Sequence, residues 1–185
     1  VVIVGTGLSM IDSVVSLLDA GHSGTITAIS RRGLLPQPHG ACKAVRFDAA
    51  DIPFGSRLSR VLRWLRGRIA ENNGDWRGVV DGLRPFTQRL WQSFPPAEKR
   101  RFLRHARPWW DVHRHRMAPQ VRARINEAIA SGQLTVKSGR VASIDAAGDC
   151  AQISFVPRGT SSVETILASH VIECRGHNAD LNKTR

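Results

Sequence analysis

The chain opens with a strand, a glycine turn and a helix, and this order restricts its fold more than any other feature. Residues 1–4 are all apolar, as a strand buried on both faces of a sheet requires. Gly5 and Gly7 follow at once, and residues 9–20 then carry apolar side chains at helical spacing. Residues 25–30 predict a second strand. Such a β-α-β unit implies two parallel strands joined by a right-handed crossover.

The middle of the chain, from Ser56 to Ser131, predicts a group of helices. Its apolar residues recur at helical spacing among many arginines, and prolines stand where helices begin. We expect helices around residues 61–69, 83–94 and 97–107, and a fourth that begins at Pro119 and stops at Gly132.

After Gly132 the apolar pattern changes to the period of two that is typical of β-strands. Strands are expected at residues 134–136, 141–144, 151–156 and 166–174. We therefore predict an α/β fold: a Rossmann-like parallel sheet with a helical insertion and a β-meander. The core would comprise residues 1–44 and 132–185, and the helical insertion residues 45–131.

Residues 5–10, Gly-Thr-Gly-Leu-Ser-Met, match the first two-thirds of the GxGxxG turn that binds dinucleotides. The first glycine permits a tight turn, and the second lets a pyrophosphate approach the backbone. The amides that follow lie at a helix N-terminus, which favours an anion. Met10 replaces the third glycine and weakens the match. The alternative is a glycine turn that binds nothing. The predicted cofactor contacts here are Gly5, Thr6, Gly7, Leu8 and Ser9.

The end of the second strand predicts the choice between NAD and NADP. An acidic residue there would bind the ribose 2′-hydroxyl of NAD, and it would repel the 2′-phosphate of NADP. This chain has Ser30, Arg31 and Arg32 instead, a hydroxyl and two guanidinium groups that suit a phosphate. We therefore favour NADP over NAD. The alternative is a basic turn that is merely solvated.

The net charge of +12 raises the question of nucleic-acid binding. Only four of the 27 basic residues are lysines, and the basic residues spread from Arg31 to Arg185 without forming a single run. Such a surface can equally reflect codon usage or the docking of an acidic domain. Because the glycine turn is the more specific signal, nucleic acid is the less favoured partner.

The cysteines and the apolar runs indicate the compartment. The three cysteines are far apart and form no CxxC, so neither a zinc site nor a dithiol pair is predicted. No apolar run approaches the roughly 18 residues of a membrane helix, and no secretory signal is visible. We therefore expect a cytoplasmic protein without a membrane partner.

Two other groups of residues suggest chemistry. His113 and His115 lie among tryptophans and arginines, where they could transfer protons at a flavin or bind an anionic substrate, but a loop-to-helix junction with buried tryptophans explains them as well. Ser9, Asp12 and His22 lack the GxSxG elbow of a hydrolase. No catalytic residue and no metal ligand is therefore assigned.

Three stretches resemble the bacterial FAD/NAD(P)-binding oxidoreductases, a largely uncharacterised group. VVIVGTGLSMIDSVVSLLDAGHSGTITAISRRGLLPQPH is similar to their second nucleotide-binding motif. RPFTQRLWQSFPPAEKRRFLRHARPWWDVHRHRMAP is similar to their helical segment, and HVIECRGHNADL to the strand and glycine that follow the β-meander in two-dinucleotide flavoproteins. The resemblance covers nearly the whole chain.

This resemblance implies a flavoprotein in which NAD(P)H delivers hydride to FAD. It also implies a cofactor contact at Gly176, although Arg175 stands where the family has a threonine before that glycine. FAD would be bound by an earlier GxGxxG motif, and none precedes Val1. Because the chain begins inside a predicted strand and without Met, we expect it to be a fragment whose partner is the missing FAD-binding domain.

The sequence thus predicts the NADP-binding part of a flavin-dependent oxidoreductase. The substrate is unknown. The alternative is a non-catalytic module of the same fold that senses a nucleotide or binds a protein.

Overall fold

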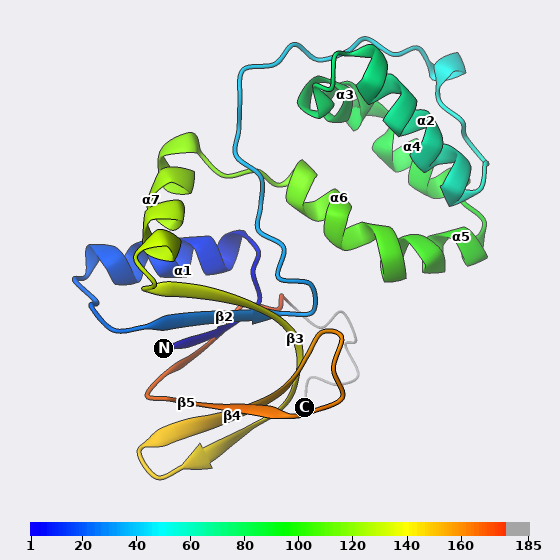
Figure 1. Cartoon of the computed structure of the whole chain (residues 1–185). Coiled ribbons are helices and arrows are strands. Elements are labelled where there is room, and N and C mark those ends of the chain that lie inside the picture. Colours follow the sequence, from blue (N-terminus) through cyan, green and yellow to red (C-terminus); the bar gives the residue numbers. More distant parts are fainter. Residues whose placement is uncertain (177–185) are drawn as a thin grey trace. The chain divides into compact units, whose positions relative to one another are not determined.

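The structure, a computed structural model, describes residues 1–176 and divides into two compact units (Figure 1). The sheet unit comprises Val1–Pro38 and the described residues from His115 onward. The helical unit comprises His39–Arg114. The predicted boundaries, 1–44 and 132–185 around an insertion of 45–131, differ from these chiefly because the helix that follows Pro119 belongs to the sheet unit. Residues 177–181, the end of the third stretch that carries the family resemblance, lie outside the described residues.

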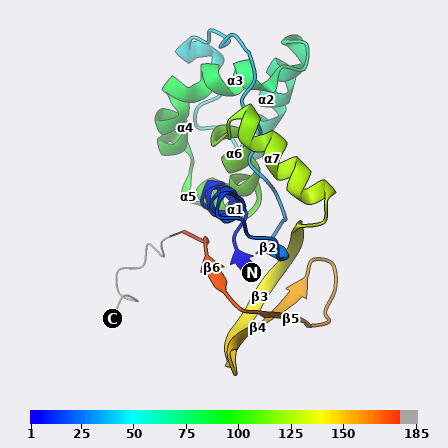
Figure 2. The ribbon, with the colours of Figure 1, turned by 90° about the vertical axis from the view of Figure 1, so that its left-hand side faces the viewer.

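The sheet unit contains one six-stranded sheet in the order β5-β4-β3-β2-β1-β6. Strands β3, β2, β1 and β6 run parallel to one another, whereas β3, β4 and β5 form an antiparallel meander. Figure 2 shows β2 and β6 on opposite sides of β1. The predicted α/β class, with its Rossmann-like sheet and meander, is confirmed. The strands are β1 (Val2–Val4), β2 (Ile26–Ser30), β3 (Leu134–Ala147), β4 (Cys150–Pro157), β5 (Glu164–Ala168) and β6 (Val171–Glu173).

Two helices, α1 (Leu8–Asp19) and α7 (Pro119–Ala130), cover one face of the parallel strands (Figure 1). Their apolar faces share a core with Ile3 of β1, to which α1 contributes the fully buried Met10 and α7 contributes Ile125. Alternation along β1 turns Val2 and Val4 to the opposite face, where they meet the meander. The sheet is therefore covered on one face by helices and on the other by its own curled extension.

Strand β3 is longer than the sequence predicts, because it continues through the gap expected between residues 136 and 141. Its first part pairs with β2 and its second part with β4. At Gly139, where the partner changes, a Cβ would lie 2.8 Å from both the Phe155 ring and the Val156 carbonyl oxygen. Glycine is required here by the close approach of β4, so it marks a bend inside a strand and not its end.

The single strand expected at residues 166–174 is two strands, β5 and β6. Ala168 pairs with β4, whereas Val171 pairs with β1. The chain thus crosses from one end of the sheet to the other between them. The uniform apolar pattern of the sequence does not reveal this change of neighbour.

The helical unit has a core of leucine, valine and aromatic side chains. The helix expected around residues 61–69 is confirmed as part of α2. The helix expected at 97–107 continues to Arg114 through one π-helical turn, so the segment read as a loop-to-helix junction is helical. The helices are α2 (Leu58–Glu71), α3 (Trp76–Leu83), α4 (Thr87–Ser93), α5 (Pro96–Arg101), the π-helix η3 (Phe102–Ala106) and α6 (Arg107–Arg114), with short 3₁₀ turns η1 (Ala49–Asp51) and η2 (Arg84–Phe86).

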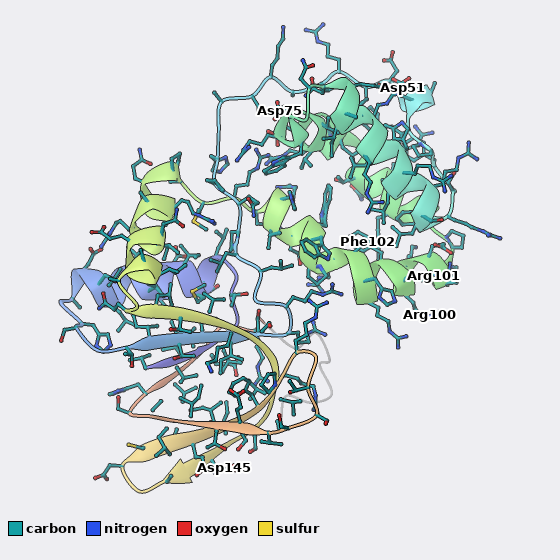
Figure 3. All side chains as sticks on the ribbon, in the orientation of Figure 1. Asp51, Asp75, Arg100, Arg101, Phe102 and Asp145 are labelled. Atoms are coloured by element: carbon teal, nitrogen blue, oxygen red, sulfur yellow. The ribbon has the colours of Figure 1, made fainter. Side chains whose placement is uncertain are left out.

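Helix α3 is the element that sequence reasoning missed, because glycine disfavours helix interiors by about 1 kcal/mol. Gly78 and Gly82 lie one turn apart and let the segment around Lys43 and Val45 approach. A Cβ on Gly78 would lie 2.5 Å from the Lys43 carbonyl oxygen, and one on Gly82 would overlap the Val45 carbonyl oxygen. Asp75, labelled in Figure 3, caps the helix by accepting a hydrogen bond of 3.0 Å from the Arg77 amide.

One buried acid joins two helices of this unit. Glu98 of α5 is only 7% exposed. One carboxylate oxygen accepts a hydrogen bond of 2.8 Å from the Leu58 amide at the start of α2, and the other accepts one of 3.1 Å from Arg101. A carboxylate at a helix N-terminus is favoured by the helix dipole, so Glu98 serves as a cap supplied by another helix.

Candidate functional site

The carboxyl ends of the parallel strands β1, β2 and β6 meet at one edge of the sheet unit. From β1 the chain proceeds to β2 on one side, and only later returns to β6 on the other side. This change of direction is a topological switch point, where open α/β sheets bind their ligands. The predicted glycine turn and Gly176 follow strands that end at this edge, and Ser30 is the last residue of β2.

Gly5 is required by the fold itself. Its φ of +118° is a conformation that side-chain-bearing residues rarely adopt. A Cβ at this position would lie 2.5 Å from the carbonyl oxygen of Cys174, just beyond β6. Its amide donates a hydrogen bond of 2.7 Å to the Ile29 carbonyl of β2. Gly5 therefore lets three strand ends pack together at the switch point.

Gly7 is different, because no contact among the described residues requires a glycine there. Its φ of −83° and ψ of −167° suit any residue. A Cβ would find no atom within 4 Å, and the residue is exposed. Gly7 is the N-cap of α1, a position where a Ser, Asp or Thr side chain would stabilise the helix through a hydrogen bond. Helix α1 has no such side-chain cap. The open space at Gly7 is thus kept at some cost to the helix.

The first amides of α1 border this space. The Met10 amide donates to the Gly7 carbonyl at 3.1 Å, so it is not available to a ligand. The amides of Leu8 and Ser9 have no hydrogen-bond acceptor within residues 1–176. Two adjacent unpaired N–H groups at the positive end of a helix dipole can bind an anion such as a phosphate.

Thr6 and Ser30 hold the two turns of the site together. The buried Thr6 hydroxyl donates a hydrogen bond of 2.6 Å to the Leu34 carbonyl. Its one proton is thereby used, so in the 2.8 Å contact between the two hydroxyls Ser30 is the donor. Ser30 in turn accepts a hydrogen bond of 3.0 Å from the Gly33 amide. The predicted Ser30 hydroxyl therefore shapes the basic turn, and its own proton is committed within the protein.

The arginines on this turn differ in exposure. Arg31 is exposed, and within the described residues it has no acidic partner. Arg32 is half-buried. The structure thus presents at least the Arg31 guanidinium beside the end of β2, one strand away from the open amides of α1.

The end of β6 carries an ion pair that the sequence did not predict. Arg175 binds Glu173 through Nε at 2.8 Å and Nη2 at 2.6 Å, and its backbone amide donates to the same carboxylate at 3.1 Å. These hydrogen bonds lower the pKa of Glu173 below its ordinary value and raise the pKa of Arg175. Gly176 follows with a φ of +82° and is exposed. Arg175 is therefore engaged by its neighbour.

The histidine segment falls in two different units. His113 belongs to α6, where its Nδ1–H donates to the Trp109 carbonyl at 2.7 Å and its ring meets Trp76 edge-on at 4.6 Å. His115 belongs to the sheet unit and is exposed. Within residues 1–176, no group of three or more histidine, cysteine or acidic residues could hold a metal ion.

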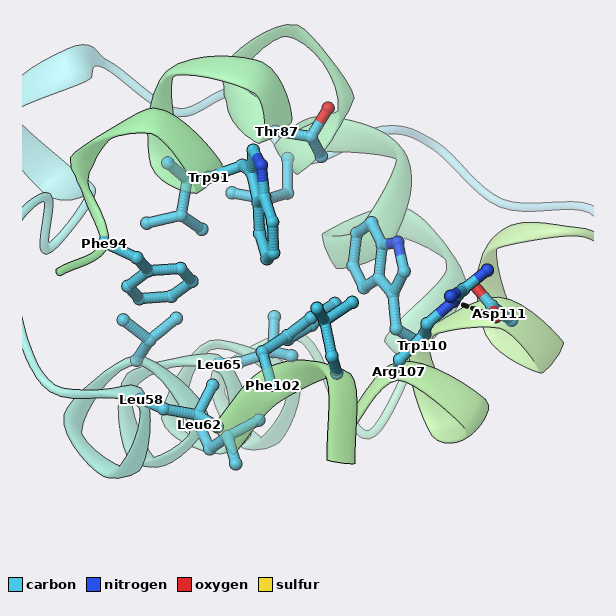
Figure 4. Close-up of a pocket in the computed structure, with 14 residues that line it drawn as sticks. Leu58, Leu62, Leu65, Thr87, Trp91, Phe94, Phe102, Arg107, Trp110 and Asp111 are labelled. Atoms are coloured by element: carbon cyan, nitrogen blue, oxygen red, sulfur yellow. Dashed lines mark ion pairs between the residues drawn. The ribbon is translucent and has the colours of Figure 1, made fainter. Parts of the chain in front are cut away.

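A hollow lies within the helical unit (Figure 4). Its volume is about 310 Å³, and leucine and aromatic side chains from α2, α4 and the η3–α6 helix line it, among them Trp91, Phe102 and Trp110. Its charged lining residues are Arg107 and Asp111, which pair at 3.4 Å. No predicted site residue lies there. The hollow suits an apolar group but lacks groups that could carry out chemistry.

No helix among the described residues has both the length and the apolar character needed to cross a membrane.

Comparison with known proteins shows a fold but no sequence family. No protein-family model matches the chain, and no curated protein matches its sequence. An ornithine hydroxylase from Pseudomonas aeruginosa in its reduced form has a TM-score of 0.53 at 16% identity over 97% of this chain. An L-lysine 6-monooxygenase from Pseudomonas syringae has a TM-score of 0.53 at 16% identity over 96% of the chain.

The likeness extends over both units of the chain, but identity this low shows a shared fold alone. The chain spans 36% of the length of the ornithine hydroxylase and 35% of that of the lysine monooxygenase.

Proposed function

We propose that this chain binds NADP at the carboxyl edge of the sheet unit, as the NADP-binding part of a flavin-dependent (FAD) oxidoreductase. The observation that carries the proposal is Gly7. Its backbone angles would accept any residue, and its missing Cβ faces open space beside two unpaired amides. A bound pyrophosphate is the occupant that makes a glycine useful at such a position.

The residues of this edge fit an NADP molecule. The amides of Leu8 and Ser9 would bind the pyrophosphate, and Gly7 would let it approach. Arg31, with Arg32 beside it, would face the 2′-phosphate. Thr6 and Ser30 would position these two turns relative to each other through their paired hydroxyls. Gly176, just beyond β6, would border the bound nucleotide on the other side of the glycine turn. NADPH, when bound, supplies a hydride.

The flavin part of the proposal rests on the family resemblance and on the fold shared with two monooxygenases of which this chain spans about a third. Within residues 1–176 the glycine turn after β1 is the one dinucleotide motif present, and in the proposal NADP takes it. FAD would therefore be held by residues outside this chain. A GxGxxG segment encoded upstream of Val1 would support this arrangement over the non-catalytic nucleotide-sensing or protein-binding module.

Calorimetric titration of the 185-residue chain with NADPH tests the nucleotide site. Gly7→Val should weaken binding about a hundredfold, because the new side chain occupies the space of the pyrophosphate and breaks at least one charged hydrogen bond. The melting temperature should stay nearly unchanged, since no protein atom lies within 4 Å of the added Cβ.

Gly67→Val is the matched control, because Gly67 of α2 also has no atom within 4 Å of an added Cβ and lies in the other unit. Its NADPH affinity should equal that of the unchanged chain. If the unchanged chain does not bind NADPH, or if Gly7→Val binds it equally well, the proposed site is wrong.

A further inference from the structure

A second turn lies beside the basic turn at the end of β2. Ser30 is paired in register with Ser138 of β3. Gly33, at the end of the basic turn, packs on Ser138, since a Cβ on Gly33 would lie 3.3 Å from the Ser138 Cβ. From the other side, the amide of Arg158 donates a hydrogen bond of 2.9 Å to the Ser138 carbonyl. Ser138 thus joins the turn after β2 to the turn after β4.

The turn that carries Arg158 is held in one conformation. Gly159 has a φ of +89°, as the third residue of a type II turn requires. The Thr160 amide donates to the Pro157 carbonyl at 3.2 Å, and the Thr160 hydroxyl donates to the same oxygen at 3.1 Å. The backbone of Arg158 therefore has a fixed place at this edge of the sheet.

The charge of Arg158 is not neutralised by any residue that the structure describes. The side chain is exposed, and within residues 1–176 it has no acidic partner. Two other basic residues of the sheet unit are paired: Lys137 contacts Glu164 at 3.3 Å, and Arg175 contacts Glu173. Arg31 and Arg158 are thus two unpaired guanidinium groups on neighbouring turns.

We propose that Arg158 is a further specificity-determining residue, which binds the 2′-phosphate of NADP together with Arg31. The inference rests on the proposed NADP site and extends it. A ribose 2′-phosphate carries more than one negative charge at neutral pH, so a second guanidinium bound to the same phosphate is electrostatically favoured. Strands β2 and β4 flank β3, and paired strands lie about 4.8 Å apart. The long side chains on the turns after β2 and β4 could therefore reach one phosphate.

Dissociation constants of the 185-residue chain for NADPH and NADH, measured at fixed ionic strength, test this inference. Arg158→Gln should weaken NADPH binding about tenfold, the effect of losing one charged hydrogen bond, and leave NADH binding unchanged. Arg158→Lys should fall between, because it keeps the charge and loses the bidentate geometry. Adenosine 2′,5′-bisphosphate and AMP serve as smaller probes, and only the first should respond to Arg158→Gln.

Arg124→Gln is the matched control. Arg124 is also a half-exposed arginine of the sheet unit, but it pairs with Asp19 at the far end of α1, about 18 Å along the helix axis from the glycine turn. The Arg124→Gln substitution removes the same charge and should change neither the NADPH nor the NADH dissociation constant. An unchanged chain that does not bind NADPH overturns the proposed function. If the unchanged chain prefers NADPH, two results for Arg158→Gln overturn this inference while the NADP site stands. Either the variant keeps the full preference for NADPH, or it loses affinity for NADH as much as for NADPH.

Discussion

The sheet unit and the helical unit use glycine for different reasons, and the sequence reveals only one of them. In the sheet unit, Gly5 follows a strand and precedes a helix, so its spacing alone predicts a turn. In the helical unit, Gly78 and Gly82 stand inside a helix, where their low helix propensity argues against one. Glycine is needed at both positions because the segment around Lys43–Val45, which is distant in sequence, packs closely against the helix. A glycine in a turn is explained locally, whereas a glycine in a helix is explained only by its neighbour in space.

The two units can be followed separately in solution. All five tryptophans lie between residues 64 and 110, within the helical unit. Tryptophan fluorescence therefore reports the unfolding of the helical unit, while far-ultraviolet circular dichroism reports both units. This difference lets each substitution be assigned to the unit in which it acts.

The largest effect is expected for Gly5→Ala. The substitution forces a side chain into a φ of +118° and places its Cβ 2.5 Å from the Cys174 carbonyl oxygen. Backbone strain and overpacking together should destabilise the sheet unit by about 4 kcal/mol. Urea unfolding followed by circular dichroism measures this loss. Gly7→Ala, two residues away and free of contacts, should change the stability by less than about 1 kcal/mol. Equal midpoints for the two variants would contradict the packing described at the switch point.

A smaller loss, of about 2 kcal/mol, is expected for Gly82→Ala. Alanine improves helix propensity by about 1 kcal/mol, but its Cβ overlaps the Val45 carbonyl oxygen and forces the segment away at a greater cost. The loss should appear in the fluorescence transition. Gly67→Ala in α2 meets no atom within 4 Å and should instead stabilise the same unit by about 0.5–1 kcal/mol. A stabilising Gly82→Ala would mean that the segment does not pack on α3.

The smallest effect concerns the ion pair of Glu173 and Arg175. Because Arg175 lowers the pKa of Glu173, the pair stabilises the sheet unit above the ordinary carboxyl pKa, and this stabilisation is lost as pH falls through the lowered value. Both side chains are about half exposed, so the contribution should stay below about 1 kcal/mol. The free energy of unfolding of Glu173→Gln should be lower than that of the unchanged chain at pH 7. The difference should vanish once the pH falls below the lowered pKa of Glu173, and a difference that persists there would point to another cause.

The sequence by itself determined the class of fold and the place of the glycine turn. Short-range patterns suffice for this, since an apolar run, a GxG turn and an amphipathic helix each follow from residues within a few positions of one another. The same holds for α7, which begins at Pro119 as expected. The sequence also singled out Arg31 and Arg32, because these residues directly follow a strand whose end was predictable.

Only the tertiary structure decided which groups of the site are available and which are committed. The Ser30 proton is taken by Thr6, the Met10 amide by Gly7, and Arg175 by Glu173. It also brought Arg158 to the basic turn through Ser138, and bent β3 at Gly139 so that β4 could follow it. Hydrogen bonds and close contacts between residues far apart in the chain decide these points, and no local pattern of side chains encodes them.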